Sequence, residues 1–195
     1  MIRKGLRQSF LLAVSLSLAA STRGQTPPAP GRTPIPVPPA TPLSADVASI
    51  DGMVKAYYDV ICGPAGVPRQ WSRDRTLYVP DVRFVIIREK KDGSGSLSAV
   101  SMTHQEYVDE SNPSFVKEGF DEREIYRVTE QFGSIANVFS TYESRRKADG
   151  PVIGRGINSL QLFHDGKRWW IASATWQDES TKHPIPKKYL PPKSK

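Results

Sequence analysis

The clearest alternation of apolar and polar positions lies in residues 155–176, which read RGINSLQLFHDGKRWWIASATW. Two apolar-rich runs flank Asp165-Gly166. An Asp-Gly pair between such runs is a strong indication of a β-hairpin, because a type I′ turn needs positive φ at both central residues. A turn centred on this pair places His164 opposite Lys167. The pattern therefore predicts a hairpin that reverses at Asp165-Gly166.

Both faces of this predicted hairpin are mostly apolar. Successive side chains alternate between the faces of a strand. One face is predicted to carry Asn158, Leu160, Leu162, Trp169, Ile171 and Ser173, and the other to carry Ile157, Gln161, Phe163, Trp170, Ala172 and Trp176. A sheet covered by helices on one side and by a partner subunit on the other satisfies this pattern, and so does a sandwich within one chain.

A second hairpin is predicted over residues 120–145, where the hydrophobic period is two on both sides of Gly133-Ser134. The register that this turn sets pairs the following residues across the strands: Arg127 with Ser140, and Ile125 with Tyr142. On this register Glu122 and Glu124 alternate with Arg123 along a solvated strand edge.

The first half of the domain has helical spacing instead. Ser44 is a candidate N-cap for an amphipathic helix that ends at Gly63-Pro64. Thr103 begins a second long helix, with Glu106 three residues on as in a capping box. The shorter elements predicted between them are a helix over 68–76 and strands over 82–88 and 97–102.

Helices and short strands thus precede four long antiparallel strands. Such segregation is typical of the α+β class, with the N-terminal helices packed on one face of a curved antiparallel sheet. The pattern predicts this fold for residues 44–181.

The ends of the chain differ from this domain in composition. Residues 1–24 place Arg and Lys before an apolar run and small residues, which is the layout of a secretory signal peptide. The apolar run is about half the ~20 residues that a membrane span needs, so an uncleaved anchor is the less favoured alternative. Residues 25–43 predict a Pro-rich disordered linker, and residues 182–195 a basic, Pro-containing tail. The predicted location is periplasmic or extracellular, with no stable membrane insertion after cleavage.

The formal net charge of +7 comes from these ends. Ten positive charges lie outside residues 44–181, so the domain itself carries a formal charge of −3. A slightly acidic domain lacks the basic footprint of a nucleic-acid binder, and no nucleic-acid partner is predicted. Cys62 is the only cysteine and cannot form an internal disulfide, and a buried apolar role is favoured for it over a nucleophilic one.

Several stretches resemble the nuclear transport factor 2-like superfamily, which includes the SnoaL-like cyclases, and within it a group of exported bacterial proteins. The matching stretches are Gly63–Gly66, Arg69–Arg75 (RQWSRDR), Phe120–Ile125 (FDEREI), Ile135–Arg145 (IANVFSTYESR) and Arg155–Ile171. The resemblance implies a cone-shaped curved sheet with a pocket between helices and sheet. It also implies a homodimer through the outer sheet face.

Candidate site residues come from the predicted geometry, since no catalytic motif of the superfamily matches. His104 and Asp51 are the candidate general bases; the alternatives are a surface histidine and an exposed helix carboxylate. The candidate pocket residues are Tyr58, Trp71, Arg127, Ser140, Tyr142, Asn158 and Ser173. A satisfied buried polar network is the alternative for this set. No cofactor and no metal site is predicted.

Two functions are compatible with these residues. The favoured one is an exported domain that binds a small, partly apolar molecule without chemistry. The alternative is a SnoaL-like hydrolase, isomerase or dehydratase that uses a pocket His or Asp as general base. A titratable group that faces a cavity beside a second polar group distinguishes the enzyme.

Overall fold

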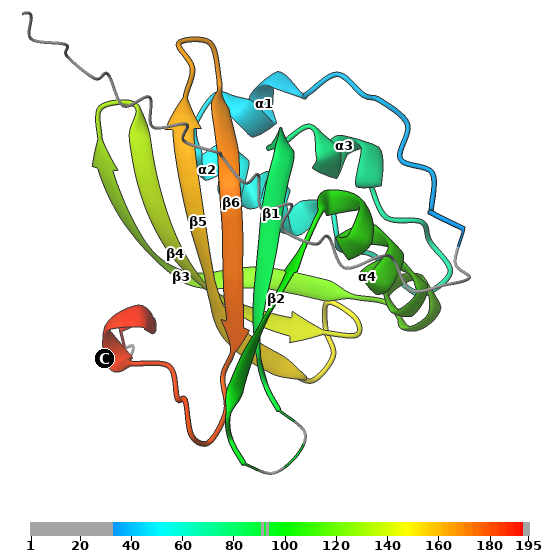
Figure 1. Cartoon of the computed structure of the whole chain (residues 1–195), viewed down its shortest axis with the longest axis vertical. Coiled ribbons are helices and arrows are strands. Elements are labelled where there is room, and N and C mark those ends of the chain that lie inside the picture. Colours follow the sequence, from blue (N-terminus) through cyan, green and yellow to red (C-terminus); the bar gives the residue numbers. More distant parts are fainter. Residues whose placement is uncertain (1–32, 91, 93, 193–195) are drawn as a thin grey trace, which may run out of the picture. The chain divides into compact units, whose positions relative to one another are not determined.

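Six strands form one curved sheet with the spatial order β2-β1-β6-β5-β4-β3 (Figure 1). The computed structural model describes residues 33–90, 92 and 94–192. The strands are β1 (Tyr78–Glu89), β2 (Leu97–Met102), β3 (Asp121–Phe132), β4 (Ile135–Arg145), β5 (Gly154–His164) and β6 (Trp169–Asp178). Neighbouring strands are antiparallel, except that β1 and β6 are parallel.

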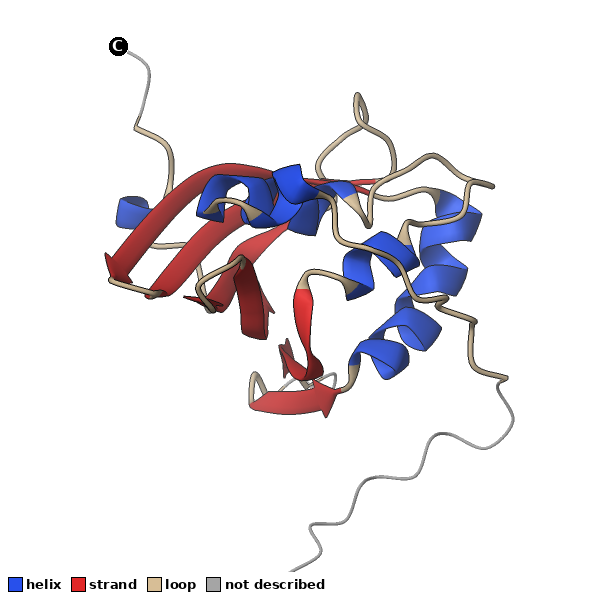
Figure 2. Cartoon of the chain, turned by 90° about the horizontal axis from the view of Figure 1, so that it is seen from above, coloured by secondary structure: helices blue, strands red, loops and turns tan. Residues whose placement is uncertain are grey.

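The helices lie on the inner side of this sheet (Figure 2). They are α1 (Ser44–Val47), α2 (Ile50–Asp59), α3 (Trp71–Arg75) and α4 (His104–Glu118). The short 3-10 helix η1 (Lys187–Tyr189) lies on the outer side, where the ring of Tyr189 stacks on Phe139 of β4 at 5.4 Å. Inward-facing residues such as Leu160, Leu162 and Ile171 are completely buried, so the core lies between sheet and helices.

This arrangement confirms the predicted α+β class and the helices on the concave face. The capping box is also confirmed, since the Thr103 hydroxyl accepts from the backbone N–H of Glu106 and the Glu106 carboxylate accepts from the backbone N–H of Thr103. The predicted first helix is wrong in one respect, because it is divided. Ser49, rather than Ser44, caps the longer part by accepting a hydrogen bond from the backbone of Gly52 at 3.0 Å.

The turn of the central hairpin differs from the prediction. The backbone N–H of Asp165 donates to the carbonyl of Arg168 at 3.1 Å, so the central residues are Gly166 and Lys167. Gly166 has a φ of 94° whereas Lys167 keeps a negative φ, so only one central residue has the positive φ that a type I′ turn needs at both. His164 consequently pairs with Trp169 instead of Lys167. The reversal is where the sequence predicts it, but the type I′ register is wrong.

An extra residue in β3 changes the register of the second hairpin. Arg127 pairs with Ser140 as predicted, but Ile125 is a bulge and Glu124 takes its place opposite Tyr142. A bulge inserts one unpaired residue, so every side chain beyond it changes face. Glu122 and Glu124 therefore face inward, and their predicted place on a solvated edge is wrong.

A second bulge lies at Ala172 in β6. Leu162 pairs with Ile171, but Gln161 pairs with Ser173, so the strand changes face between them. Ser173 consequently lies on the outer face and Trp176 on the inner one, the reverse of the predicted assignment.

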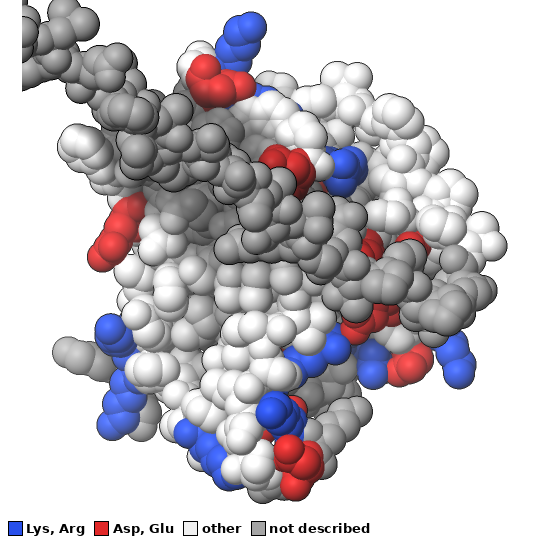
Figure 3. Space-filling view, in the orientation of Figure 1, with Lys and Arg blue, Asp and Glu red and all other residues white. Residues whose placement is uncertain are grey.

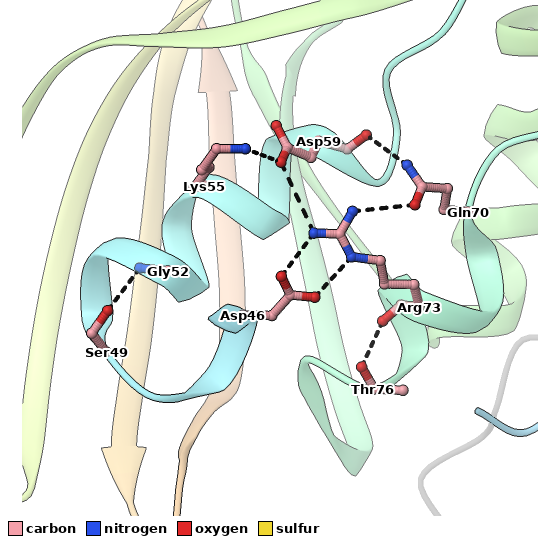
Figure 4. Close-up of polar contacts among 8 residues, drawn as sticks. All are labelled: Asp46, Ser49, Gly52, Lys55, Asp59, Gln70, Arg73 and Thr76. Atoms are coloured by element: carbon pink, nitrogen blue, oxygen red, sulfur yellow. Dashed lines mark hydrogen bonds and ion pairs between the residues drawn. The ribbon is translucent and has the colours of Figure 1, made fainter. Parts of the chain in front are cut away.

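An ion-pair cluster joins the three N-terminal helices (Figure 4). Arg73 of α3 donates from Nε and Nη2 to the two carboxylate oxygens of Asp46 in α1, at 2.8 and 2.7 Å. Its Nη2 lies 3.9 Å from Asp59 at the end of α2. Asp46 is buried, and a two-pronged Arg–carboxylate contact in such a place fixes orientation as well as distance.

The segments on both sides of the domain pack against it. The backbone of Ile35 exchanges hydrogen bonds with Asp109 and Gln105 of α4, at 2.8 and 2.9 Å. This part of the expected disordered linker is thus held by the domain, while residues 25–32 lie outside the described residues. At the other end Ile185 is buried and the hydroxyl of Thr141 donates to the carbonyl of Tyr189 at 2.6 Å.

We predict that Gly166→Val destabilises the protein by ~1–2 kcal/mol, because a β-branched residue resists positive φ. A Cβ at Gly166 would have no heavy atom within 4 Å beyond its chain neighbours, so the effect comes from the backbone alone. The expected fall in Tm is roughly 3–8 °C by calorimetry. Lys167→Val, in the same turn at negative φ, is the control. Equal melting of both variants would show that the turn is not strained by a side chain at Gly166.

Candidate functional site

A cavity of about 230 Å³ lies between the inner face of the sheet and the helices α2 and α4. Six aromatic side chains form much of its wall: Tyr57, Tyr107, Phe115, Phe120, Tyr142 and Trp176. The rings support one another, since Phe115 stacks on Phe120 at 4.0 Å and Tyr107 meets Trp176 edge-on at 5.8 Å. The second bulge is what turns Trp176 into this cavity.

Two carboxylates also line the cavity, Glu122 of β3 and Asp178 at the end of β6. The hydroxyl of Tyr142 donates to Asp178 at 2.5 Å. The hydroxyl of Tyr57 donates to the amide oxygen of Asn158 at 3.2 Å. The polar groups of the wall thus come from strands and helices that are distant in sequence.

Glu122 is a carboxyl group of the cavity wall whose pKa is raised into the neutral range. Burial raises the pKa of Glu122 to about 8, the negative charge of Asp178 adds to the rise, and the amide of Asn158 opposes it. The residue is half-buried as a whole, with its carboxyl end in the cavity wall. A carboxyl group with this pKa is mainly protonated at pH 7 and can give or take a proton near neutrality.

Cys62 holds the backbone of Glu122 in place. Its Sγ donates to the carbonyl of Glu122 at 3.2 Å and accepts from the N–H of the same residue at 3.1 Å. Burial raises the pKa of the Cys62 thiol to about 12, so the group stays protonated at neutral pH. A protonated thiol agrees with the preference for a non-nucleophilic Cys62, but the residue is half-buried and hydrogen-bonded rather than packed in an apolar site.

The tyrosine hydroxyls of the wall stay protonated as well. Burial raises the pKa of Tyr57, of Tyr107 and of Tyr142 well above the ordinary value. They act as hydrogen-bond donors and acceptors, and they contribute no charge at physiological pH.

The structure brings five of the predicted pocket residues together. Tyr142 and Asn158 line the cavity. Tyr58, Ser140 and Arg127 form a network beside it: the Tyr58 and Ser140 hydroxyls are 2.7 Å apart, and the Asn158 amide donates to Tyr58 at 3.1 Å. Ser140 also donates to Glu124, whose carboxylate accepts from Nε of Arg127 at 3.0 Å. That any of them contacts a ligand stays a prediction.

Trp71 and Ser173 lie elsewhere. The indole of Trp71 is buried, donates to the side chain of Asn112 at 2.7 Å and stacks on Phe115, so it supports the cavity wall from behind. Ser173 is on the outer face because of the bulge at Ala172.

The two candidate bases do not face the cavity. The His104 ring is buried and its Nε2 lies 2.8 Å from Asp74, whose other oxygen accepts from the hydroxyl of Tyr78 at 2.9 Å. The surface position considered for His104 is therefore wrong too. The Asp51 side chain is 89% exposed and pairs with Arg127 at 2.7 Å, so it is not an inner acid.

The sequence analysis did not identify Glu122 or Asp178 as residues of the cavity, for a different reason in each case. The bulge at Ile125 carries no recognisable sequence mark, and without it Glu122 falls on the wrong face. Asp178 ends the last strand, where a polar residue is usual. Among the described residues, no group of three or more His, Cys, Asp or Glu side chains is placed to hold a metal ion. The helices in the described ranges are too short or too polar to span a membrane.

Comparison with known proteins gives likeness in fold only. The sequence matches no protein-family model and no curated protein. Among solved structures, a nuclear transport factor 2-like protein of unknown function from Silicibacter pomeroyi is 15% identical, with a TM-score of 0.46, covering 68% of this chain and 94% of that one. One of the same description from Methylobacillus flagellatus is 12% identical, with a TM-score of 0.44, covering 68% and 95%.

A domain of unknown function with a cystatin-like fold from Nostoc punctiforme is 10% identical, with a TM-score of 0.46, covering 69% of this chain and 79% of that one. In fold the chain is similar to these nuclear transport factor 2-like proteins. At these identities and TM-scores, nothing about ligand or reaction follows from the likeness. The narrower resemblance to an exported bacterial group stays a prediction.

We predict that Glu122→Gln stabilises the protein increasingly as the pH rises. The folded state holds the Glu122 proton up to a pKa of about 8, whereas the ordinary value is 4.5. Between these values the folded state binds more protons than the unfolded one, so wild-type stability falls with rising pH. Gln at this position removes that loss.

The expected gain at pH 8 is ~2 kcal/mol, less than the full shift implies because Glu122 is partly exposed, and near zero at pH 4.5. Urea unfolding across this range measures it. Glu130→Gln, exposed on the same strand, is the control. A constant difference between wild type and Glu122→Gln over the whole range would contradict the assigned titration.

Proposed function

We propose that this protein binds a small, partly apolar molecule in the cavity between its helices and the inner face of its sheet. The observation that carries this proposal is the composition of the wall, in which six aromatic rings and two isoleucines stand beside six polar or charged side chains. Concave sites with apolar walls and a small number of placed polar groups are typical ligand pockets. The cavity of about 230 Å³ is below the usual ~300–1,000 Å³ for drug-sized ligands, which favours a smaller molecule.

Exposed residues at one end of the cavity support an entry route for a ligand there. Arg88 lines the cavity and its side chain is 48% exposed, and it pairs with Glu110 of α4 at 2.7 Å. Asp178 is also exposed and lines the same cavity. A small molecule entering here would pass charged groups and then reach the aromatic wall.

The second candidate function is a hydrolase, isomerase or dehydratase. The observation that favours it is the pair of Glu122 and Asp178 beside the Tyr142 hydroxyl, with a Glu122 pKa of about 8. Such a group meets the requirement for a general acid or base near neutral pH. In this form the alternative rests on Glu122 and Asp178 in place of His104 and Asp51. Binding is favoured, because a raised carboxyl pKa also arises wherever burial removes water.

Export of the domain is part of the proposal. It is supported by the signal-peptide layout of residues 1–24. The place of action would then be the periplasm or the extracellular space.

A native mass spectrum of the protein purified from its own host tests binding and export together. We expect a retained small molecule, and a chain mass that lacks residues 1–24. Ser111→Trp should abolish retention, because Ser111 lines the cavity and a bulky ring there fills it. Ser114→Trp, exposed on the same helix, should retain the molecule.

Retention by both tryptophan variants would contradict binding in this cavity. Chemical change of the retained molecule on incubation with the protein would replace binding by catalysis. A mass that includes residues 1–24 would contradict cleavage of a signal peptide.

We also propose a homodimer through the outer sheet face. Phe132 and Ile135 are 84% and 54% exposed at the tip of the β3–β4 hairpin, and Phe163 pairs with both Ile135 and Trp170 on that face. Figure 3 shows acidic and basic side chains at the edges of this view and also toward its middle. An exposed apolar patch is typical of a protein interface.

We predict that Phe163→Lys converts the dimer to a monomer, because a lysine ammonium cannot be buried there without a partner. Light scattering after gel filtration measures the mass. Ser114→Lys, on the helix side of the domain, is the control and should leave the dimer intact. A wild-type protein of monomer mass would refute this interface.

A further inference from the structure

We propose that the ligand of this cavity is a small organic cation, held by Glu122 and Asp178 within the aromatic wall. This inference rests on the proposed binding function and names the chemistry of the ligand. Its basis is the coincidence of an aromatic enclosure, two carboxylates and a lack of free positive charge among the described residues of one cavity.

The wall has the composition of a cation-binding enclosure. Its rings come from separate parts of the chain: Tyr57 from α2, Tyr107 and Phe115 from α4, Phe120 from the segment before β3, Tyr142 from β4 and Trp176 from β6. Aromatic faces carry negative potential and attract ammonium groups, by about 2 kcal/mol or more where water is excluded. Four of these rings have a hydroxyl or an N–H, so the wall can also hydrogen-bond a polar substituent.

The charge of the wall disfavours an anionic ligand. Asp178, and Glu122 once it has lost its proton, would repel a carboxylate or a phosphate. Arg88 is the basic residue of the described wall, and Glu110 already pairs with it at 2.7 Å. The cavity therefore carries carboxylate groups that no basic side chain of its described wall neutralises, and a cationic ligand would neutralise them.

The titration of Glu122 makes this chemistry dependent on pH. The charged or titratable groups around Glu122 are Asp178 from β6, Tyr57 and Tyr58 from α2, Tyr107 from α4, Tyr142 from β4, Cys62 from the segment after α2, and Arg88 from β1. The tyrosines and Cys62 stay neutral near neutral pH, because burial raises the pKa of each. A cation must displace the proton of Glu122, so its affinity should rise with pH until Glu122 is ionised.

The competing chemistry has the opposite dependence. A protonated Glu122 can donate a hydrogen bond to a carbonyl or hydroxyl oxygen of a neutral ligand. Such a ligand would lose its donor as the pH rises, and its affinity would fall. The sign of the pH dependence thus separates the two kinds of ligand.

A matched pair of probes tests the inference on the full-length mature protein. Choline carries a quaternary ammonium that never titrates, and 3,3-dimethyl-1-butanol has the same shape without the charge. Isothermal titration calorimetry should show choline binding at least tenfold more tightly than the alcohol at pH 9. Between pH 6 and 8 the choline affinity should rise by about fiftyfold in all, because release of one proton with a pKa of about 8 sets a tenfold limit per pH unit that is reached only well below this pKa.

Two variants locate the effect. Glu122→Gln should bind choline with no pH dependence and with a smaller advantage over the alcohol, because Asp178 and the aromatic wall remain, and circular dichroism should show it folded. Asp178→Asn, altered at an exposed position, should keep the pH dependence and weaken choline binding at every pH.

The outcomes separate this inference from the proposed function. Equal affinity of the wild type for the two probes would overturn the proposal of a cationic ligand. A choline affinity that falls as the pH rises would overturn it as well. If Ser111→Trp then abolished both, the cavity would still be a binding site. Binding of neither probe would also overturn the proposal of a cationic ligand. Retention of another molecule in the native mass spectrum would still test the proposed binding function, independently of this proposal.

Discussion

The position of α4 over the sheet depends on the buried hydrogen bond between Asp74 of α3 and His104 at the start of α4. Both side chains are almost completely buried, and Tyr78 of β1 donates to the second oxygen of Asp74. A buried polar group that loses its partner costs about 1–3 kcal/mol, so this bond specifies one placement of the three elements. Tyr107, Ser111 and Phe115 follow His104 at intervals of three and four residues and therefore lie on one face of α4. That face is the helical side of the cavity.

The sheet side of the cavity depends on two bulges. Side chains change face at Ile125 in β3 and at Ala172 in β6, and these changes bring Glu122 and Trp176 inward. Bulges also increase the local bend of a strand, which suits a sheet that curves around its helices. A continuous ladder on either strand would instead place a carboxylate in solvent and an indole on the outer face.

The two bulges explain which features of the fold and of the site were predictable from the sequence. The class, the concave helical layer and the inward set of Arg127, Ser140, Tyr142 and Asn158 follow from periods of two and 3.6 and from the Gly133-Ser134 turn. The predictions for Glu122, Ser173 and Trp176 went wrong beyond a bulge, because a one-residue insertion inverts every later face and leaves no mark in residue type. His104 was misplaced for another reason: its partner Asp74 lies 30 residues earlier, and no local pattern joins the two.

Glu122 links the stability of the domain to its proposed function. A carboxyl group whose pKa is raised to about 8 weakens the fold whenever it is charged, and an amide of the same shape would not. Cys62 nevertheless fixes the backbone of this residue from both sides, and the aromatic wall encloses its carboxyl end. Glu122 thus lowers the stability of the fold, although its backbone is held firmly and it lines a cavity. A ligand that pairs with its carboxylate would explain this combination. A cationic ligand would offset the unfavourable burial, and would thereby stabilise the fold most at the pH values where the empty protein is weakest.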